Sequence, residues 1–319
     1  MSKPILWMTA GSSYSATSPL AYTLQYNSKY VSGGCIKEGG QFLYCIEKFN
    51  RLLGPKGYEL SINLFQNRIK QRKKLKNFVS LTLEDVSRRY HRIDQSEGHR
   101  VCVDHYVPNL DKIWVEPYTI DQYIEYLYAL WDVVKKLGYK GVADFGNSKR
   151  WCSEEFWVEN ADKIKEHFDV KVGLIVRDPI RRSWSCNYSK HNGELHEIFH
   201  KNDWAFNYLP VYDRFKKFFD THLIVMEELW EDDGTEKKKL EQFIDYKLGD
   251  LHRNIYAPDR GHLLDEFDLN LKDQCEKLPE LPPELYMSIR EGLYAPIYQA
   301  WEDRFGKLPL YWGSPLEYK

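Results

Sequence analysis

The residues whose spacing points most clearly to chemistry are Arg177 and Ser185, which follow the apolar run Val172–Val176. This short run is rich in β-branched residues, as buried parallel strands are. Asp178 and Pro179 suit an N-cap and a first helical position, so a helix is expected to begin there. Arg177 then lies at the carboxyl end of a strand, where open α/β sheets bind ligands. Ser185 follows about two helical turns later and faces the same end of the sheet. This guanidinium and hydroxyl suit a cluster of anionic oxygens such as a phosphate.

A second candidate anion site is the serine-rich loop Gly11–Ser18, which joins an expected strand to an expected helix. Ser18 can cap that helix, and the exposed N–H groups at a helix start attract anions. The loop is not a Walker A loop, because Ala16 and Thr17 stand where that pattern requires Gly and Lys. Taken alone, the loop also fits an ordinary surface turn with a helix cap. Its hydroxyl donors are Ser12, Ser13, Ser15, Thr17 and Ser18.

The elements that must position these residues alternate between strand and helix along the chain. The expected strands are Pro4–Ala10, Arg100–Asp104, Lys140–Phe145, Val172–Val176 and His222–Met226. The expected helices are Pro19–Lys29, a long helix from Thr119 to the stop at Gly138, Ser153–Phe168, the helix after Asp178-Pro179, Thr235–Leu248 with Gly249 behind it, and two last helices that flank Pro296. This alternation predicts an α/β fold with a central, mostly parallel sheet flanked by helices. We expect one domain over residues 1–319, with a mainly helical insertion at about 50–118.

The composition is that of a soluble globular protein, with 43% hydrophobic and 29% charged residues. A net charge of −2 does not produce the positive electrostatic potential that attracts nucleic acid. No apolar run approaches the roughly 20 residues of a membrane span. The first residues lack a signal-peptide pattern, and the six cysteines include no CxxC pair, which indicates free thiols. We therefore expect a cytoplasmic protein with no nucleic-acid or membrane partner; the sequence does not indicate its oligomeric state.

The two anion sites together resemble those of the sulfotransferases that use 3′-phosphoadenosine-5′-phosphosulfate (PAPS), a family with a P-loop-like fold. A nucleotide with phosphates at both its 5′ and 3′ positions would span two such sites. The family holds the 3′-phosphate with RxPxxRxxS after a strand, and residues 177–185 read RDPIRRSWS, which matches every fixed position. The resemblance therefore gives Arg177 and Ser185 the 3′-phosphate role. It aligns Thr17 and Ser18 with the last two residues of the family's 5′-phosphosulfate loop, GxxKxGTT, and the same loop here includes Ser13, Ser15 and Ala16.

Other segments extend the resemblance over most of the chain. Val225–Leu229, followed by residues 240–249, is similar to the family's YEDL strand and its later helix ending in FLG. Arg260 and Gly261 resemble the basic-residue-plus-glycine loop that closes over the 3′-phosphate. Residues 281–306 look like the family's C-terminal helices, whereas residues 50–118 show no such similarity.

The chain departs from the family pattern at Tyr14 and Ala16, where the 5′ loop normally has Lys and Gly. The lysine matters because negative charge builds on the bridging oxygen during sulfuryl transfer, and a cation stabilises that charge. Tyr14 can donate a hydrogen bond but carries no charge near neutral pH. Lys37 and Glu38 resemble the KExxFF-like segment of carbohydrate sulfotransferases, which implies Glu38 as general base and Lys37 as the cationic aid. The alternative is two polar residues in a glycine-rich turn.

The acceptor is expected to be a hydroxyl or an amine, and the Lys-Glu segment points toward a carbohydrate. Asn147 and Ser148 follow an expected strand where the family has its substrate segment, so they could contact the acceptor; a plain loop is the alternative. The chemistry requires no metal, since fixed cations and dipoles can carry the charge.

Three other functions compete with this hypothesis. The sequence His196-Glu197-Ile198-Phe199-His200 is a literal HExxH, the pattern of zinc peptidases, but charged residues flank it and no third ligand follows. A nucleotide-binding relative without catalytic activity is suggested by Tyr14 and Ala16. A P-loop kinase is disfavoured by the missing GK[ST].

Overall fold

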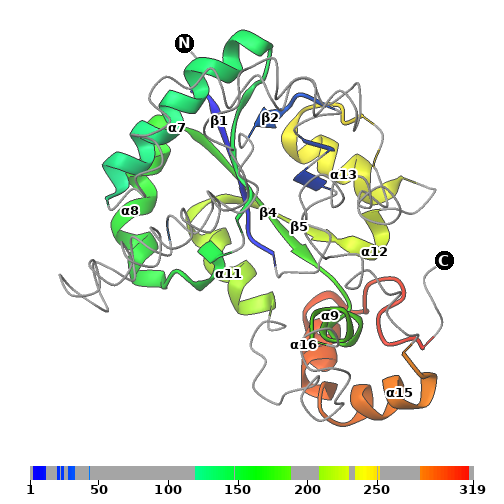
Figure 1. Ribbon diagram of the computed structural model, residues 1–319. Helices are drawn as coiled ribbons and strands as arrows, with labels where there is room; N and C mark the ends of the chain where they lie inside the picture. The colour runs from blue at the N-terminus through cyan, green and yellow to red at the C-terminus, as the bar shows by residue number, and fades with distance from the viewer. Residues whose placement is uncertain are drawn as a thin grey trace, which may run out of the picture. The chain divides into compact units, whose positions relative to one another are not determined.

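The computed structural model describes residues 3–11, 20–21, 23–24, 28–32, 43, 119–146, 148–187, 208–229, 234–249, 251 and 281–315 (Figure 1). The strands within these ranges are β1 (Ile5–Thr9), β2 (Val31–Ser32), β3 (Gly141–Asp144), β4 (Asp169–Val176) and β5 (Asp220–Val225). The longer helices are α7 (Ile120–Val134), α8 (Glu154–His167), α9 (Pro179–Asn187), α11 (Tyr208–Phe218), α13 (Thr235–Ile244), α15 (Pro283–Glu291) and α16 (Ala295–Phe305). The short ones are α12 (Met226–Leu229) and the 3₁₀ turns η4 (Lys135–Leu137) and η5 (Ser148–Trp151).

The strands form one sheet in the order β2-β3-β1-β4-β5. Both β1 and β2 pair with β3 in parallel, with Ile5 and Val31 opposite Gly141. A side chain at position 141 could not fit, because its Cβ would lie 2.1 Å from the Ile5 carbonyl oxygen. The predicted α/β fold with a parallel sheet flanked by helices is therefore confirmed. The predicted insertion at 50–118 and the expected strand Arg100–Asp104 lie outside the described residues.

The chain divides into two compact units, and it crosses from one to the other within β1 and within β4. We define unit 1 by its elements β2, α7, β3 and α8, together with β1 up to Met8. Unit 2 consists of β4 from Val172 onward, α9, α11, β5, α12, α13, α15 and α16.

In unit 1, α7 and α8 pack against each other, and α7 also packs on β3 (Figure 1). The apolar face of α7 includes the buried residues Ile124 and Leu127, spaced as an amphipathic helix requires. The helix continues into η4 and stops at Gly138, which has a φ of 89° and donates its N–H to Lys135. Helix α8 begins as predicted, because the Ser153 hydroxyl accepts the Phe156 N–H at 3.1 Å.

In unit 2, the predicted strand and helix around residue 177 are confirmed as β4 and α9. Helix α13 ends at Ile244, four residues before the predicted end at Leu248. Asp245 takes a left-handed conformation with a φ of 48° and donates its N–H to carbonyls of the last turn, so it closes the helix before Gly249 is reached. Helix α16 begins at Ala295, so Pro296 lies within its first turn instead of between the two last helices.

A cluster of aromatic side chains packs in the interior of unit 2. The Trp312 ring contacts the rings of Trp301, Tyr298 and Tyr208 at centroid distances of 4.7, 6.4 and 6.1 Å. These four side chains are all buried, so they are core residues of the unit. Within the ranges that the structure describes, no helix is long and apolar enough to cross a membrane.

Candidate functional site

The candidate site in unit 2 is the turn between β4 and α9. Strand β4 ends at Val176 and α9 begins at Pro179, so Arg177 and Asp178 form the connection. The Asp178 side chain is fully buried, and its Oδ1 accepts the Arg181 N–H at 2.9 Å. This is the N-cap hydrogen bond that the Asp-Pro pair predicts, and it fixes where the helix starts.

Arg177 and Ser185 come together as their spacing predicts. The Nη1 atom of Arg177 donates a hydrogen bond to the Ser185 hydroxyl at 3.1 Å, and both residues are half-buried. The guanidinium therefore lies over the first turns of α9, with a hydroxyl beside it. A guanidinium with a neighbouring hydroxyl is a suitable set of donors for a phosphate or sulfate group. Their role as ligands of a 3′-phosphate stays a prediction.

Two buried carboxylates lie close to Arg177 and shape its electrostatics. Burial lowers the pKa of Arg177, and the charges of Glu227 and Asp178 act in the opposite direction. Burial is also the main reason that the pKa of Glu227 rises to about 7, and the charge of Asp178 adds to this rise. The hydrogen bond from Asp178, the Arg177 guanidinium and the Trp312 indole limit the rise. Glu227 is only 2% exposed, so its carboxyl titrates inside the protein.

Glu227 connects the turn to the C-terminal segment. Its Oε1 accepts the backbone N–H of Asp178 at 2.9 Å, and its Oε2 accepts the indole N–H of Trp312 at 3.0 Å. The residue lies just after β5, in the short helix α12. The sequence marked this stretch only through its similarity to YEDL, and no local pattern indicated that Glu227 would reach the turn after β4.

Asp178 holds the same C-terminal part of unit 2 with its second oxygen. Its Oδ2 accepts the hydroxyls of Tyr286 at 2.7 Å and Tyr298 at 2.9 Å. Burial and then the Asp178 charge raise the pKa of both phenols, so the hydroxyls stay protonated donors. Helix α15 packs against α9 and α16 around this carboxylate.

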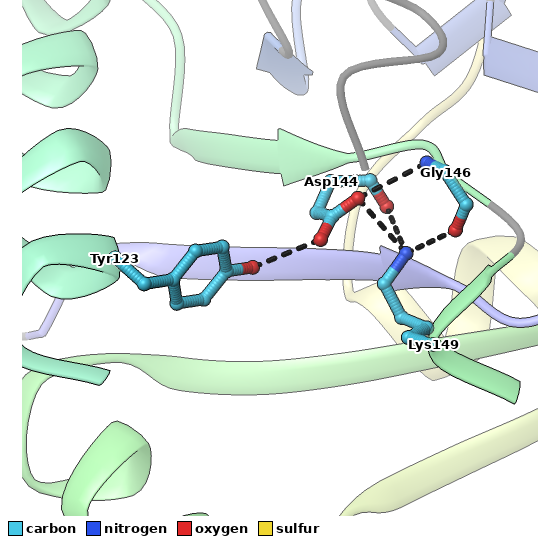
Figure 2. Close-up of polar contacts among 4 residues, drawn as sticks. All are labelled: Tyr123, Asp144, Gly146 and Lys149. Atoms are coloured by element: carbon cyan, nitrogen blue, oxygen red, sulfur yellow. Dashed lines mark hydrogen bonds and ion pairs between the residues drawn. The ribbon is translucent and has the colours of Figure 1, made fainter. Parts of the chain in front are cut away.

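A second polar cluster follows β3 in unit 1, where the sequence reads DFGNSK (Figure 2). The Lys149 side chain is fully buried, and its ammonium donates to Asp144 Oδ1 at 2.9 Å, to the Asp144 carbonyl at 3.0 Å and to the Gly146 carbonyl. The Tyr123 hydroxyl from α7 donates to Asp144 Oδ2 at 3.0 Å. Figure 2 shows these groups converging on the carboxylate of Asp144.

This second cluster closes the loop after β3. Burial lowers the pKa of Lys149, and the charge and hydrogen bond of Asp144 oppose that effect. The ammonium is surrounded by oxygen acceptors of its own loop, so its contacts indicate a structural role. The predicted acceptor contacts of Asn147 and Ser148 are not tested, because the side chains of these two residues are outside the described part.

Most of the predicted site residues fall outside the described residues. They are Tyr14, Lys37 and Glu38, the loop residues Ser13, Ser15, Ala16, Thr17 and Ser18, Arg260 and Gly261, and the HExxH residues His196 to His200. Among the residues that are described, no group of three or more His, Cys, Asp or Glu side chains could hold a metal ion.

The fold and the turn after β4 define an α/β protein with a parallel sheet and an arginine-containing candidate anion site at a strand end. In comparisons with protein-family models and with characterised proteins, no family model and no protein matches this sequence. The sulfotransferase hypothesis therefore depends on the residues of the chain itself.

Proposed function

We propose that this protein is a sulfotransferase that moves a sulfuryl group from PAPS to a hydroxyl or amine acceptor, with a carbohydrate as the acceptor class to test first. The observation that carries the proposal is the Arg177–Ser185 hydrogen bond at 3.1 Å, inside a sequence that matches RxPxxRxxS. A phosphate bound beside Arg177 and Ser185 would receive the guanidinium and the hydroxyl as donors. The candidate site lies at the carboxyl end of β4, and open α/β sheets bind ligands at the carboxyl ends of their strands.

The proposed reaction is an in-line displacement at sulfur. The acceptor oxygen or nitrogen forms a bond to sulfur while the bond from sulfur to the 5′-phosphate oxygen breaks, and that electron pair stays on the phosphate. Glu38 takes the proton of the acceptor, and the products are the sulfated acceptor and adenosine 3′,5′-bisphosphate. Lys37 and Tyr14 are the proposed donors to the leaving oxygen, and Thr17 and Ser18 to the 5′-phosphate.

Calorimetric titration with adenosine 3′,5′-bisphosphate tests the nucleotide part of the proposal. Arg177→Ala removes a charged donor and should cost about 1.5–3 kcal/mol, which is roughly a ten- to hundredfold higher Kd. Ser185→Ala should cost less, because it removes a neutral hydroxyl. Arg304→Ala is the matched control: it removes the same charge from α16, where Arg304 forms an exposed pair with Asp213 at 2.9 Å. Equal affinity of the wild type and Arg177→Ala would refute the assignment.

Transfer of labelled sulfate from PAPS to a panel of hydroxyl and amine acceptors tests the reaction itself. We expect transfer by the wild type and its loss in Glu38→Ala at saturating donor. The replacement of the usual lysine by Tyr14 favours one other candidate, a relative that binds the nucleotide without transferring sulfate. Tight binding with no transfer to any acceptor, and transfer gained in Tyr14→Lys, would identify that relative.

A further inference from the structure

The peptide unit between Arg177 and Asp178 is held by side chains at its two opposite edges. The Arg177 carbonyl accepts the Tyr208 hydroxyl at 3.0 Å, and the Asp178 N–H donates to Glu227 Oε1 at 2.9 Å. Because a peptide unit is planar and rigid, two hydrogen bonds on opposite sides fix its orientation. Together with strand β4 on the other side of Arg177, this restricts the direction in which the Arg177 side chain leaves the backbone.

The two side chains that hold this peptide unit, Tyr208 and Glu227, both contact Trp312. Its indole N–H donates to Glu227 Oε2 at 3.0 Å, and its ring lies 6.1 Å from the ring of Tyr208. Glu227, Tyr208 and Trp312 are all buried, at 2%, 3% and 4% exposure. None of the three hydrogen bonds described here uses the Arg177 guanidinium, which contacts Ser185 instead.

We propose that Glu227 is a positioning residue for the anion site, which acts through the Arg177–Asp178 peptide unit and aims the Arg177 side chain. This inference rests on the proposed function, because it assumes that Arg177 binds the phosphate of a nucleotide. Glu227 itself does not contact the anion.

The hydrogen-bond chemistry explains why a carboxylate is needed at this position. Two donors, the Asp178 N–H and the Trp312 indole N–H, face the two oxygens of Glu227. A glutamine has the same shape but only one oxygen, so its amide NH₂ would face one of these donors. An apolar side chain would leave both donors without their partner.

The test is a mutant cycle measured by calorimetry with adenosine 3′,5′-bisphosphate at pH 8, above the pKa of Glu227 of about 7, so that Glu227 is a carboxylate. Glu227→Gln should raise the Kd about tenfold, because one donor in the turn loses its acceptor. Trp312→Phe removes the competing indole N–H, so the double variant Glu227→Gln/Trp312→Phe should recover most of the affinity. Glu228→Gln is the matched control: this neighbouring glutamate accepts the Leu310 N–H, and its loss should leave the Kd as in the wild type.

Tyr208→Phe gives a second measurement in case the tryptophan variants do not fold. It removes only the hydroxyl that holds the Arg177 carbonyl and keeps the ring contacts with Trp312 and Trp301. We expect a severalfold rise in Kd. The thermal unfolding midpoint of every variant is measured in parallel, so that lost affinity is separated from lost stability.

Several results would overturn the inference. Glu227→Gln and Tyr208→Phe with wild-type affinity and lower unfolding midpoints would show a purely structural role. A double variant as weak as Glu227→Gln alone would show that the effect does not pass through the two donors.

If the wild type does not bind the nucleotide, the proposed function fails, and the same cycle is measured with inorganic sulfate. The positioning role of Glu227 is then supported if Arg177→Ala and Glu227→Gln both weaken sulfate binding, and it is refuted if either variant binds sulfate as the wild type does.

Discussion

The buried carboxyl of Glu227 makes the stability of this protein depend on pH in a defined direction. Burial, followed by the charge of Asp178, raises the pKa of Glu227 from its ordinary value of 4.5 to about 7. In the unfolded chain the group loses its proton through pH 4.5, whereas in the folded protein it keeps the proton up to about pH 7. The stability that this group contributes is therefore fully present below pH 4.5 and is lost as the pH rises through 7.

The size of the effect follows from the pKa values of the unfolded and the folded protein. A difference of one pH unit between them is worth about 1.36 kcal/mol, so the whole rise corresponds to about 3 kcal/mol. Between pH 5 and pH 8, the contribution of Glu227 to the free energy of unfolding should fall by about 2.5 kcal/mol. Glu227→Gln cannot titrate, so the difference between the wild type and this variant should change by this amount over the same range.

Urea unfolding followed by circular dichroism at pH 5, 6, 7 and 8 measures this difference. The fixed cost of placing an amide between two donors moves the Glu227→Gln curve equally at every pH, so the change with pH isolates the titration. Glu228→Gln serves as the control, because it removes a carboxylate of the same helix that accepts the Leu310 N–H in an exposed hydrogen bond. Wild-type and Glu227→Gln stabilities that run parallel from pH 5 to 8 would refute the reasoning.

Two further predictions concern unit 1. Lys149→Met leaves the Asp144 carboxylate buried without its ammonium partner, so the free energy of unfolding should fall by about 3–5 kcal/mol in urea. Lys165→Met, which removes an exposed lysine paired with Asp162, is the control, and a loss below about 1 kcal/mol for Lys149→Met would contradict this role. Gly141→Ala places a Cβ 2.1 Å from the Ile5 carbonyl oxygen, so the pairing of β1 with β3 should fail and the cooperative thermal transition should be lost. Gly306→Ala is the control, because a Cβ there meets no atom within 4 Å and is disfavoured only by the left-handed φ of 74°. This variant should lower the free energy of unfolding by about 1 kcal/mol. Similar losses of stability for Gly141→Ala and Gly306→Ala would argue against the close approach of β1 and β3.

Local patterns in the sequence were sufficient for the features that depend on near neighbours. The apolar run before Arg177 predicted β4, the Asp178-Pro179 pair predicted the start of α9, and Ser153 predicted the start of α8. Each of these depends on groups a few residues apart, because strand runs, N-caps and first-turn prolines act within one or two turns of backbone. The same local geometry brought Arg177 to Ser185, which lies on the helix that follows directly.

Tertiary structure decided everything that joins this turn to distant parts of the chain. Glu227 reaches the Asp178 N–H from the end of β5, and Tyr286 and Tyr298 reach the Asp178 carboxylate from helices more than a hundred residues later. No spacing rule predicts such contacts, because they depend on how separate elements pack. The raised pKa of Glu227 has the same origin, since burial and a neighbouring charge exist only in the folded protein. The sequence by itself therefore determined that Arg177 and Ser185 meet at the strand end, and the fold decided which distant side chains hold the turn between them.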